Sequence, residues 1–562
     1  MDKEIKYEDK PWLAYYEKGV QPNLNYKEIC LPEFLDNSVA EFPDNTAYIF
    51  QGYKITFRDF DDMVNRFATC LTDFGIQSGD SVAILLPNLI PCAAAYYAIL
   101  KIGAVAVMNN PLYSDRELEH QFNDSGAKIL VTLDLLGNRM IDLRPKTQIK
   151  QIIYTSIGDY LPFPKNILFP LVAKKKKLAA DVKPADDLFK WKDVIKKYPP
   201  TPPKVKLTFE DVAMYQYTGG TTGVSKGAIL THGNLSKQAQ QINGWIPDLN
   251  RGQETMLAAL PFFHVMGLTA SLNLAICNGW TNILVPKPQP EPLLEAMAKF
   301  KPTLAPLVPT MFIGLLSHPD IGTTDLTSIK VCISGSAPLP IEIIKDFEGK
   351  TGSIIIEAFG MTESSPATHI NPFNKDSRKV GSIGIPIADT ECRIVDLAFP
   401  TKSVAVGEAG ELVIKGPQVM RGYLNMEEET AKTVVDGWLH TGDIATMDED
   451  GYFYIVDRIK DMIISGGYNV YPRDIDEVLF EHPKVQEACA VGVPHETRGE
   501  QIKAFIVLKE GTTATEEEII TYCKEKLAAY KLPTSITFME ELPKTNVGKV
   551  LRKELRKMDA ES

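Results

Sequence analysis

The apolar residues between positions 55 and 155 follow two alternating spacings. Phe60, Val64, Phe67 and Leu71 recur every three or four positions, which predicts an amphipathic helix. Val82–Leu86, in contrast, is a short continuous apolar run that ends at Pro87, which is typical of a buried strand. Strands separated by helix-length segments predict a parallel α/β sheet. The same rhythm resumes later in a second series of runs: Met256–Leu260, Ile283–Pro286, Leu304–Val308, Ile329–Ile333 and Ile354–Ala358.

The pattern changes between residues 380 and 456. Short β runs are separated there by glycine-rich turns, including Asp436-Gly437 and Asp450-Gly451, and Asp-Gly is a strong hairpin signal. This stretch therefore predicts a small antiparallel β unit. About one hundred residues follow Asp457 with strands and helices of their own, which indicates a separate α+β domain.

Residues 157–207 interrupt the α/β rhythm. The segment 161–173 is apolar but broken by prolines, and it leads directly into Lys174–Lys177. Our interpretation is an inserted surface loop with a solvated run of charge. The alternative hypothesis is a membrane-surface contact through residues 161–178, in which apolar side chains enter the headgroup region while lysines meet anionic lipid, at about 1 kcal/mol per Lys.

Composition narrows the class of protein. The formal net charge is −12, so no overall basic field attracts nucleic acid. The eight cysteines are scattered, without a C-x-x-C pair, which predicts reduced core residues in a cytoplasmic protein. We expect no signal peptide, because the first residues are charged, and no membrane span, because Pro91, Lys101 and Gly103 interrupt the longest apolar stretch.

The segment Tyr217-Thr-Gly-Gly-Thr-Thr-Gly-Val-Ser-Lys-Gly227 carries the clearest chemistry. It follows an apolar run, its glycines permit close backbone approach to a ligand, and Lys226 adds positive charge. Backbone N–H groups, hydroxyls and one cation suit a polyphosphate. The segment is not a Walker A loop, because Ser225 precedes the lysine and Gly227 follows it.

This segment closely resembles the phosphate loop of the acyl-adenylate-forming enzymes, which include acyl-CoA synthetases, adenylation domains and luciferases. Four later segments match the motifs of that family in the same order, and the resemblance extends from about residue 30 to residue 557. They are Glu357-Ala-Phe-Gly-Met-Thr-Glu-Ser-Ser-Pro366, Trp438-Leu-His-Thr-Gly-Asp443, Asp457-Arg-Ile-Lys-Asp-Met-Ile-Ile-Ser-Gly-Gly-Tyr-Asn-Val-Tyr-Pro472 and Pro543-Lys-Thr-Asn-Val-Gly-Lys549.

The resemblance, together with the pattern, predicts the fold class α/β. A large N-terminal domain, residues 1–458, would hold two α/β sheet subdomains and a small β-barrel-like subdomain at about 380–456. Residues 459–562 would form a small mobile α+β domain, with Lys460 at the hinge.

The resemblance also assigns nucleotide-binding residues. Phe359 would stack on adenine, Thr362 would contact the α-phosphate, and Glu363 would ligate Mg²⁺. Thr218 would place its hydroxyl near the same metal ion. Asp443 would accept hydrogen bonds from the ribose. The remaining residues expected around ATP are Gly219, Gly220, Thr221, Thr222, Gly223, Lys226, Gly335, Ser336, Ala337, Gly360, Met361 and Arg458.

Further residues are assigned to the acid and the thiol. His264, in Pro261-Phe-Phe-His-Val-Met-Gly267, is expected to gate or position the acyl group and not to transfer protons. Gly466 and Gly467, with Tyr468, would border the path of coenzyme A. By resemblance Lys549 bridges the carboxylate and the α-phosphate during adenylation. The C-terminal domain would therefore need two orientations, one for each half-reaction.

The predicted activity is an ATP-dependent, AMP-forming acyl-CoA synthetase, most similar to prokaryotic long-chain fatty acid–CoA ligases. Its substrates would be a fatty acid, ATP and coenzyme A. Three alternatives stay open: a medium-chain or aryl acid–CoA ligase, an acyl-AMP ligase that loads a carrier protein, and an inactive acyl or nucleotide sensor. We also expect a homodimer, in the cytoplasm or peripherally on the cytoplasmic face of the membrane.

Overall fold

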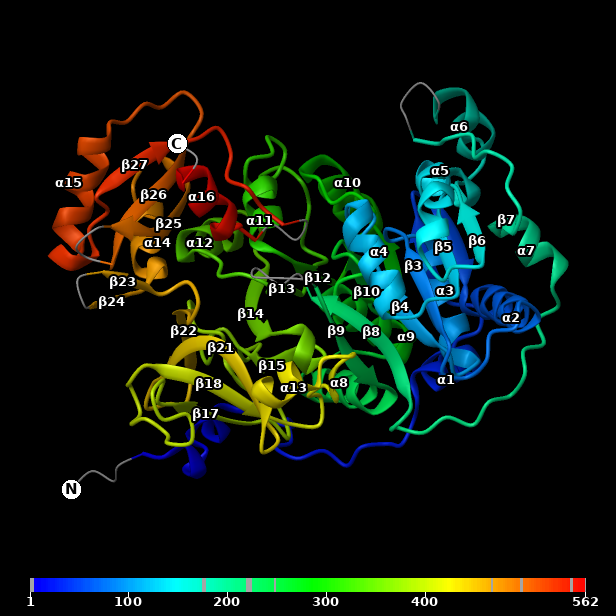
Figure 1. The fold of residues 1–562 in the computed structure, drawn as a ribbon, viewed down its shortest axis with the longest axis horizontal. Helices are drawn as coiled ribbons and strands as arrows, with labels where there is room; N and C mark the ends of the chain where they lie inside the picture. Colours follow the sequence, from blue (N-terminus) through cyan, green and yellow to red (C-terminus); the bar gives the residue numbers. More distant parts are fainter. Residues whose placement is uncertain are drawn as a thin grey trace.

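The computed structural model describes residues 5–173, 178–218, 225–246, 249–465, 468–495, 499–545 and 549–560. Within these residues the chain forms four sheets (Figure 1). Two large sheets with their helices make up most of the molecule, a third antiparallel sheet lies beside them, and the fourth belongs to the C-terminal part of the chain. This agrees with the predicted α/β class.

The first large sheet has eight strands in the order β19-β9-β8-β4-β3-β5-β6-β7. Strands β3 to β8 run parallel, as the alternating pattern predicted, whereas β9 and β19 pair antiparallel at one edge. The strands are β3 (Ser81–Leu85), β4 (Val105–Met108), β5 (Ile129–Leu133), β6 (Gln151–Thr155), β7 (Leu188–Lys190), β8 (Val212–Thr218), β9 (Lys226–Thr231) and β19 (Gly422–Tyr423). Their helices are α2 (Phe57–Asp73), α3 (Ile90–Lys101), α4 (Asp115–Asp124), α5 (Asp134–Leu143), α6 (Lys165–Ala173) and α7 (Trp191–Lys197).

Helix α3 shows why the longest apolar stretch is no membrane span. Every residue from Ile90 to Leu100 is buried. Protein therefore surrounds the helix on all sides, which accounts for apolar residues around its whole circumference. None of the helices in the described part of the chain has the length and apolar content that crossing a membrane requires. All eight cysteines are described, buried and unpaired, as predicted.

The second large sheet has nine strands in the order β16-β15-β14-β13-β12-β10-β11-β1-β2. Its strands are β1 (Thr46–Phe50), β2 (Tyr53–Thr56), β10 (Thr255–Ala258), β11 (Thr281–Leu284), β12 (Leu304–Leu307), β13 (Val331–Ser334), β14 (Ile354–Gly360), β15 (Ala367–Ile370) and β16 (Ile385–Pro386). The accompanying helices are α1 (Leu31–Glu41), α8 (His232–Trp245), α9 (Leu274–Asn278), α10 (Pro290–Phe300), α11 (Pro309–Leu316) and α12 (Ile341–Thr351).

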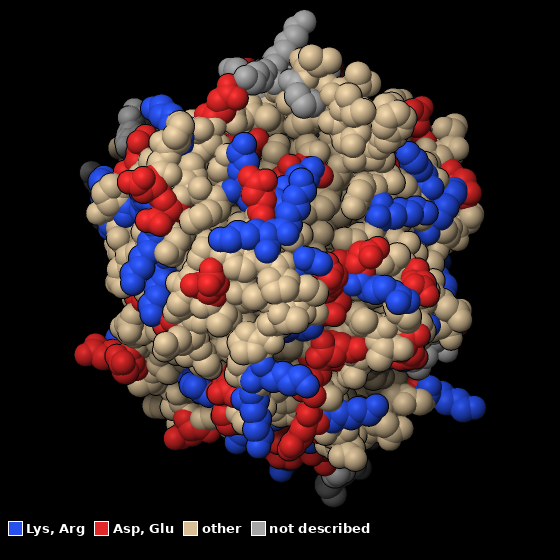
Figure 2. Space-filling view, turned by 90° about the vertical axis from the view of Figure 1, so that its right-hand side faces the viewer, with Lys and Arg blue, Asp and Glu red and all other residues tan. Residues whose placement is uncertain are grey.

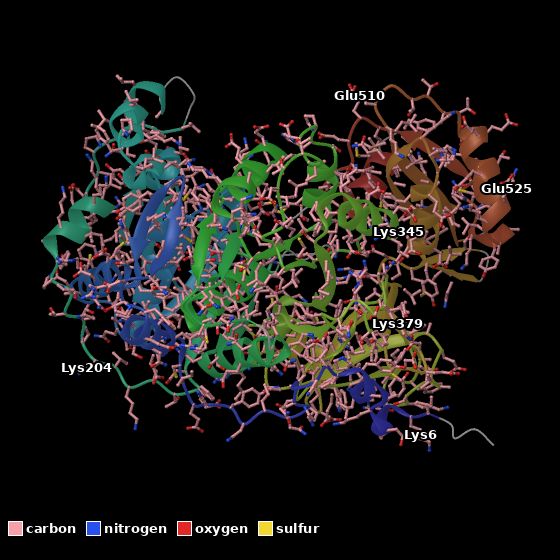
Figure 3. The ribbon with its side chains drawn as sticks, turned by 180° about the vertical axis from the view of Figure 1, so that it is seen from behind. Lys6, Lys204, Lys345, Lys379, Glu510 and Glu525 are labelled. Carbon is pink, nitrogen blue, oxygen red and sulfur yellow. The ribbon has the colours of Figure 1, made fainter. Side chains whose placement is uncertain are left out.

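The third sheet is the small antiparallel unit predicted between residues 380 and 456. It contains β17 (Glu391–Val395), β18 (Gly410–Lys415), β20 (Val434–Val435), β21 (Trp438–Met447) and β22 (Phe453–Arg458), and α13 (Glu427–Thr433) precedes β20. Asp436 and Gly437 both have positive φ, 52° and 80°, and close the β20–β21 hairpin as the Asp-Gly signal predicts. Lys379, labelled in Figure 3, fixes this sheet to the second one through Asp448 and Asp450, at 2.6 Å each.

The fourth sheet, after residue 462, has its own hydrophobic clusters. It comprises β23 (Ile463–Ser465), β24 (Tyr468–Val470), β25 (Val485–His495), β26 (Gly499–Leu508) and β27 (Ser535–Phe538), with helices α14 (Pro472–Phe480), α15 (Glu516–Lys526) and α16 (Arg552–Ala560). The α+β character of this part was predicted correctly. The boundary between residues 458 and 459 stays a prediction.

The region 157–207 differs from its sequence interpretation. Residues 188–190 form edge strand β7, and α7 follows at once. Trp191 and Val194 are buried in the core beside Phe67, so the surface-loop interpretation is wrong for this part. The short strand and helix were not predicted from this proline-rich sequence, because a three-residue strand shows no periodicity. Lys174–Lys177 lie outside the described residues.

Candidate active site

One pair of predicted site residues, Asp443 on β21 and Arg458 on β22, lies on neighbouring strands. The two strands pair these residues directly, and Arg458 Nε lies 2.8 Å from Asp443 Oδ1. Asp443 is only 3% exposed, and its Oδ2 is buried without a partner among the described residues. Burial raises the pKa of Asp443, and the positive charge of Arg458 acts in the opposite direction. A buried acceptor without a partner needs a hydrogen-bond donor. The ribose hydroxyls, which the sequence analysis expects Asp443 to bind, are such donors.

Lys549 lies close to this pair. The pKa of Lys549 is lowered to about 8: loss of hydration lowers it most, the positive charge of Arg458 also lowers it, and Asp443 raises it. The backbone of Lys549 is held by Thr545, whose Oγ1 accepts from the Lys549 N–H at 3.1 Å. The structure therefore brings together three predicted residues that are separated by 15 to 106 positions in the sequence. In this arrangement the C-terminal region presents its lysine to the nucleotide-site residues.

Lys460, the predicted hinge residue, belongs to the same electrostatic environment. Loss of hydration lowers the pKa of Lys460, Arg458 lowers it as well, and Asp461 raises it. Asp461 in turn pairs with Arg556 of α16 at 3.2 Å. The segment around the predicted hinge is thus tied to the last helix.

A second group surrounds Glu363. This carboxylate is 8% exposed, and Tyr423 donates its hydroxyl proton to Glu363 Oε1 at 2.6 Å. Tyr423 is on β19, which pairs with β9 and so reaches Lys226. Lys226 Nζ lies 5.0 Å from the centroid of the Tyr423 ring and 2.6 Å from Glu429 Oε2 of α13. Thr218 pairs with Lys226 across β8 and β9, so the two ends of the predicted phosphate loop are adjacent.

Tyr423 and Glu429 were not predicted from the sequence. Glu429 belongs to the run Glu427-Glu428-Glu429, which by itself indicates only a solvated helix start. Tyr423 is nearly 200 positions from Lys226, and no local pattern marks it.

Not all of the predicted site residues belong to the described part of the chain. Gly219, Gly220, Thr221, Thr222 and Gly223 lie outside the described residues, and so do Gly466 and Gly467. The side chain of Tyr468 also lies outside them. Their roles stay predictions.

The predicted adenine segments come from adjacent parallel strands. Gly335, Ser336 and Ala337 follow β13, while Phe359 and Gly360 end β14, its neighbour. Strand ends of an α/β sheet are where such folds bind ligands. Gly360 has no room for a side chain, since a Cβ there would lie 2.0 Å from Pro366 O.

The neighbouring contacts connect these strand ends to the predicted acyl motif. A Cβ at Gly335 would lie 2.8 Å from Met266 Cε, and Ser336 has φ of 70°. The Phe359 ring meets His369 edge-on at 6.1 Å between centroids. Met361 and Thr362 are half-buried and lead into Glu363.

His264 has the environment of an uncharged group. Burial lowers the pKa of His264 to about 4, so the imidazole is neutral at pH 7, and its Nδ1 accepts from the Met266 N–H at 3.4 Å. A neutral ring suits contact with an acyl group. A π-helix, Gly267–Asn273, follows, and Thr269 Oγ1 donates to Ser365 O at 2.9 Å. Such π-helical turns frequently occur at functional sites.

Glu357, two residues before Phe359, is a further titratable group at the site. Burial raises the pKa of Glu357 to about 7, while the Gly381 N–H, which donates to Oε2 at 2.9 Å, and the charge of Arg473 lower it. Arg473 is the second residue of α14 in the C-terminal part and also donates to Ile455 O. Glu357 therefore faces the fourth sheet's first helix.

The donor set fits the predicted metal ion. No group of three or more His, Cys, Asp or Glu side chains forms a metal cage within the described part of the chain. Mg²⁺ retains water and is usually held by one or two carboxylates plus substrate phosphates. Glu363, oriented by Tyr423 beside Lys226, provides such a carboxylate next to a phosphate loop.

The fold and the site together define the class. The chain belongs to the AMP-binding enzyme family: the family model matches residues 35–424, and the model of the AMP-binding enzyme C-terminal domain matches residues 474–549. ATP, Mg²⁺ and coenzyme A are the small molecules that fit such enzymes.

The individual relatives are similar over nearly their whole length. The long-chain-fatty-acid–CoA ligase of Bacillus subtilis (strain 168) is 44% identical, over 98% of this chain and 99% of the relative. The long-chain-fatty-acid–CoA ligase of Escherichia coli O157:H7 is 39% identical, over 97% and 98%.

Solved structures have the same fold. ATP-bound MatB from Rhodopseudomonas palustris superimposes with a TM-score of 0.83 at 28% identity, over 94% of this chain and 99% of that one. The anthranilate CoA ligase AuaEII with anthranoyl-AMP gives 0.85 at 26% identity, over 99% and 100%.

Proposed function

We propose that this protein is an ATP-dependent long-chain fatty acid–CoA ligase. It activates a fatty acid as acyl-AMP with release of pyrophosphate, and then transfers the acyl group to coenzyme A with release of AMP. The observation that carries the proposal is the approach of Lys549 to Asp443 and Arg458. Full-length similarity to ligases named for long-chain fatty acids supports the substrate class.

The adenylation step joins two anions, so the site must supply positive charge and donors. Asp443 and Arg458 fix the ribose, which aims the α-phosphate at the acid. Lys549, beside them, bridges the carboxylate and the α-phosphate and stabilises the charge that develops between them. Lys226 neutralises the β- and γ-phosphates. When bound, Mg²⁺ would be held by Glu363 and Thr218 and would supply Lewis-acid stabilisation of the phosphates.

The second half-reaction needs Lys549 out of the way and a path for the thiol. We propose that residues 459–562 rotate about Lys460 and bring Gly466 and Gly467 to the acyl-adenylate. The neutral His264 then lies against the acyl group and does not act on the thiol proton. Separate hydrophobic clusters in the C-terminal part are what independent movement requires.

The decisive experiment measures pyrophosphate release with straight-chain acids of increasing length and with aryl acids, each with and without coenzyme A. We expect the highest kcat/KM for long chains and acyl-CoA formation only when the thiol is present. Pyrophosphate release confined to medium-chain or aryl acids would replace the substrate class. Acyl-AMP that accumulates despite coenzyme A would favour the carrier-loading alternative. Absence of release with every acid would leave the inactive sensor.

An aryl substrate is the second candidate, because AuaEII, named as an anthranilate CoA ligase, has the same fold over the whole chain. Its identity of 26% is well below the 44% of the Bacillus relative, so we rank the long-chain acid first. Benzoate and anthranilate therefore belong in the acid panel.

We further propose that α6 contacts a membrane surface peripherally, in a cytoplasmic protein. Phe163, Ile167, Leu168 and Leu171 are 79%, 62%, 52% and 78% exposed, so apolar side chains face solvent around one short helix. In Figure 1 α6 projects at an upper corner, and Figure 2 shows a largely uncharged area at the top of that side. Large exposed apolar groups of this kind mark interaction sites, and four lysines follow in the sequence.

Sedimentation with anionic vesicles tests this contact. Ile167→Ser with Leu171→Ser should reduce the bound fraction several-fold, and replacing Lys174–Lys177 by Ser should also reduce it. Leu112→Ser is the matched control, because Leu112 is 75% exposed elsewhere on the surface. Equal binding by all variants would contradict the contact. The homodimer stays a prediction that sedimentation velocity of the full chain tests.

A further inference from the structure

Lys226 is fixed at the mouth of the phosphate loop. It is the first residue of β9, and it pairs with Thr218, the last residue of β8. The sheet register therefore sets the position of its backbone, and only the side chain can change its partner. Under the proposed function that partner is the polyphosphate of ATP, and later the pyrophosphate that leaves.

In the structure Lys226 already has a negative partner. Its Nζ lies 2.6 Å from Glu429 Oε2 and over the ring of Tyr423. The contact lowers the pKa of Glu429, chiefly through the hydrogen bond with Lys226, so the carboxylate is ionised at neutral pH. The cation of the loop is therefore compensated before any phosphate arrives.

The geometry makes this pair easy to exchange. The side chains of Lys226 and Glu429 are 31% and 40% exposed, and solvent-exposed ion pairs are weak. Glu429 also has another partner on its own helix, since Lys432 Nζ lies 3.4 Å from Oε1. When Lys226 turns to a phosphate, the charge of Glu429 remains compensated.

We propose that Glu429 is a resident counter-ion of Lys226 that polyphosphate must displace, so that its carboxylate weakens pyrophosphate binding and promotes pyrophosphate release. This inference rests on the proposed function, because it takes Lys226 as a phosphate-binding residue. The exchange moves no proton and breaks no covalent bond. One carboxylate oxygen leaves the lysine, and one phosphate oxygen replaces it.

The test compares two glutamates of one helical turn. Glu429→Gln removes the counter-ion but keeps the size of the side chain, and Glu428→Gln removes the same charge at an exposed position one residue away. Binding of inorganic pyrophosphate, with Mg²⁺ present, is measured by calorimetry and by product inhibition of adenylation. We expect Glu429→Gln to bind pyrophosphate about 2- to 5-fold more tightly, the range for one exposed ion pair. Glu428→Gln should match the wild type.

A double-mutant cycle separates the direct contact from repulsion through space. In a Lys226→Met background Glu429→Gln should leave pyrophosphate affinity unchanged, because the carboxylate no longer has a lysine to hold. Three results would overturn the inference: weaker or unchanged binding in Glu429→Gln, an equal gain in Glu428→Gln, or a gain that persists without Lys226.

The wild-type protein separates failure of the counter-ion proposal from failure of the proposed function. If the wild type binds pyrophosphate and releases it in an acid-dependent reaction, failure of the Glu429 variant refutes only the counter-ion. If no acid supports pyrophosphate release, the proposed function itself fails.

Discussion

The lowered pKa of Lys549 predicts an unusual pH dependence of adenylation. Burial and the neighbouring charge of Arg458 bring the pKa to about 8, from an ordinary value near 10.5. Only the protonated amine can bridge two anions. The adenylation half-reaction should therefore lose rate as the pH rises through 8, in a range where an ordinary lysine would stay charged.

The size of the loss follows from the protonated fraction. With a pKa of about 8, roughly nine-tenths of Lys549 is charged at pH 7 and roughly one-tenth at pH 9, a decline of about tenfold. An unperturbed lysine would lose only a few per cent over that range, by the same relation. Bound ATP raises the pKa by adding negative charge, so kcat/KM, which reports the free enzyme, is the parameter to follow.

The assay measures kcat/KM for pyrophosphate release between pH 6.5 and 9.5 at constant ionic strength, with ATP and fatty acid both below their KM and without coenzyme A. Lys549→Arg is the informative variant, because a guanidinium stays charged throughout. Its rate should be lower overall, but the decline above pH 8 should disappear. A wild-type profile that stays flat to pH 9.5, or a decline that persists in Lys549→Arg, would refute the reasoning.

Three further predictions concern single residues. Lys549→Ala should slow adenylation at least about 10²- to 10³-fold, as expected for the loss of one charge aimed at the reacting groups. It should largely spare acyl transfer from supplied acyl-adenylate to the thiol. Equal loss of both half-reactions would contradict a role of Lys549 in adenylation alone. Asp443→Asn should raise the KM for ATP about 10- to 100-fold, the cost of a charge-assisted hydrogen bond, and calorimetry should find AMP binding weakened as well; unchanged AMP affinity would argue against ribose binding. Glu357→Gln should raise the thermal unfolding midpoint at pH 8 but not at pH 4.5. In the folded state Glu357 keeps its proton up to about pH 7, whereas in the unfolded chain it releases the proton near pH 4.5. The free energy of unfolding therefore decreases between these two pH values and is lower by on the order of 1–3 kcal/mol above them. An equal gain at both pH values would exclude titration as the cause.

The elements that the sequence predicted best are the buried parallel strands. Val82–Leu86 and Ile354–Ala358 lie within one or two residues of β3 and β14, because continuous apolar runs bounded by turn residues have few alternative structures. The strand β7 and the π-helix at 267–273 were missed. Their residues resemble those of loops and ordinary helices, and only tertiary packing selects the observed conformation.

In the candidate site, too, some residues were predicted from the sequence and others were missed. Asp443, Arg458 and Lys549 were predicted from motifs, and the structure brings them together. Tyr423 and Glu429 belong to no local pattern. Both reach Lys226 only because β19 pairs with β9, a contact between segments almost 200 positions apart. Such pairings are decided by the whole sheet, so single-sequence reasoning has no signal for them.

This late pairing also constrains how the protein is made. A ribosome completes β9 long before it synthesises Tyr423, so the nascent chain exposes an unpaired strand edge, and the ammonium at its start has no aromatic cover. Fragments that end before residue 422 should expose this edge and aggregate or recruit chaperones, whereas fragments that extend through α13 should cover it. The Lys226–Tyr423 contact therefore cannot form until about three-quarters of the chain has been synthesised.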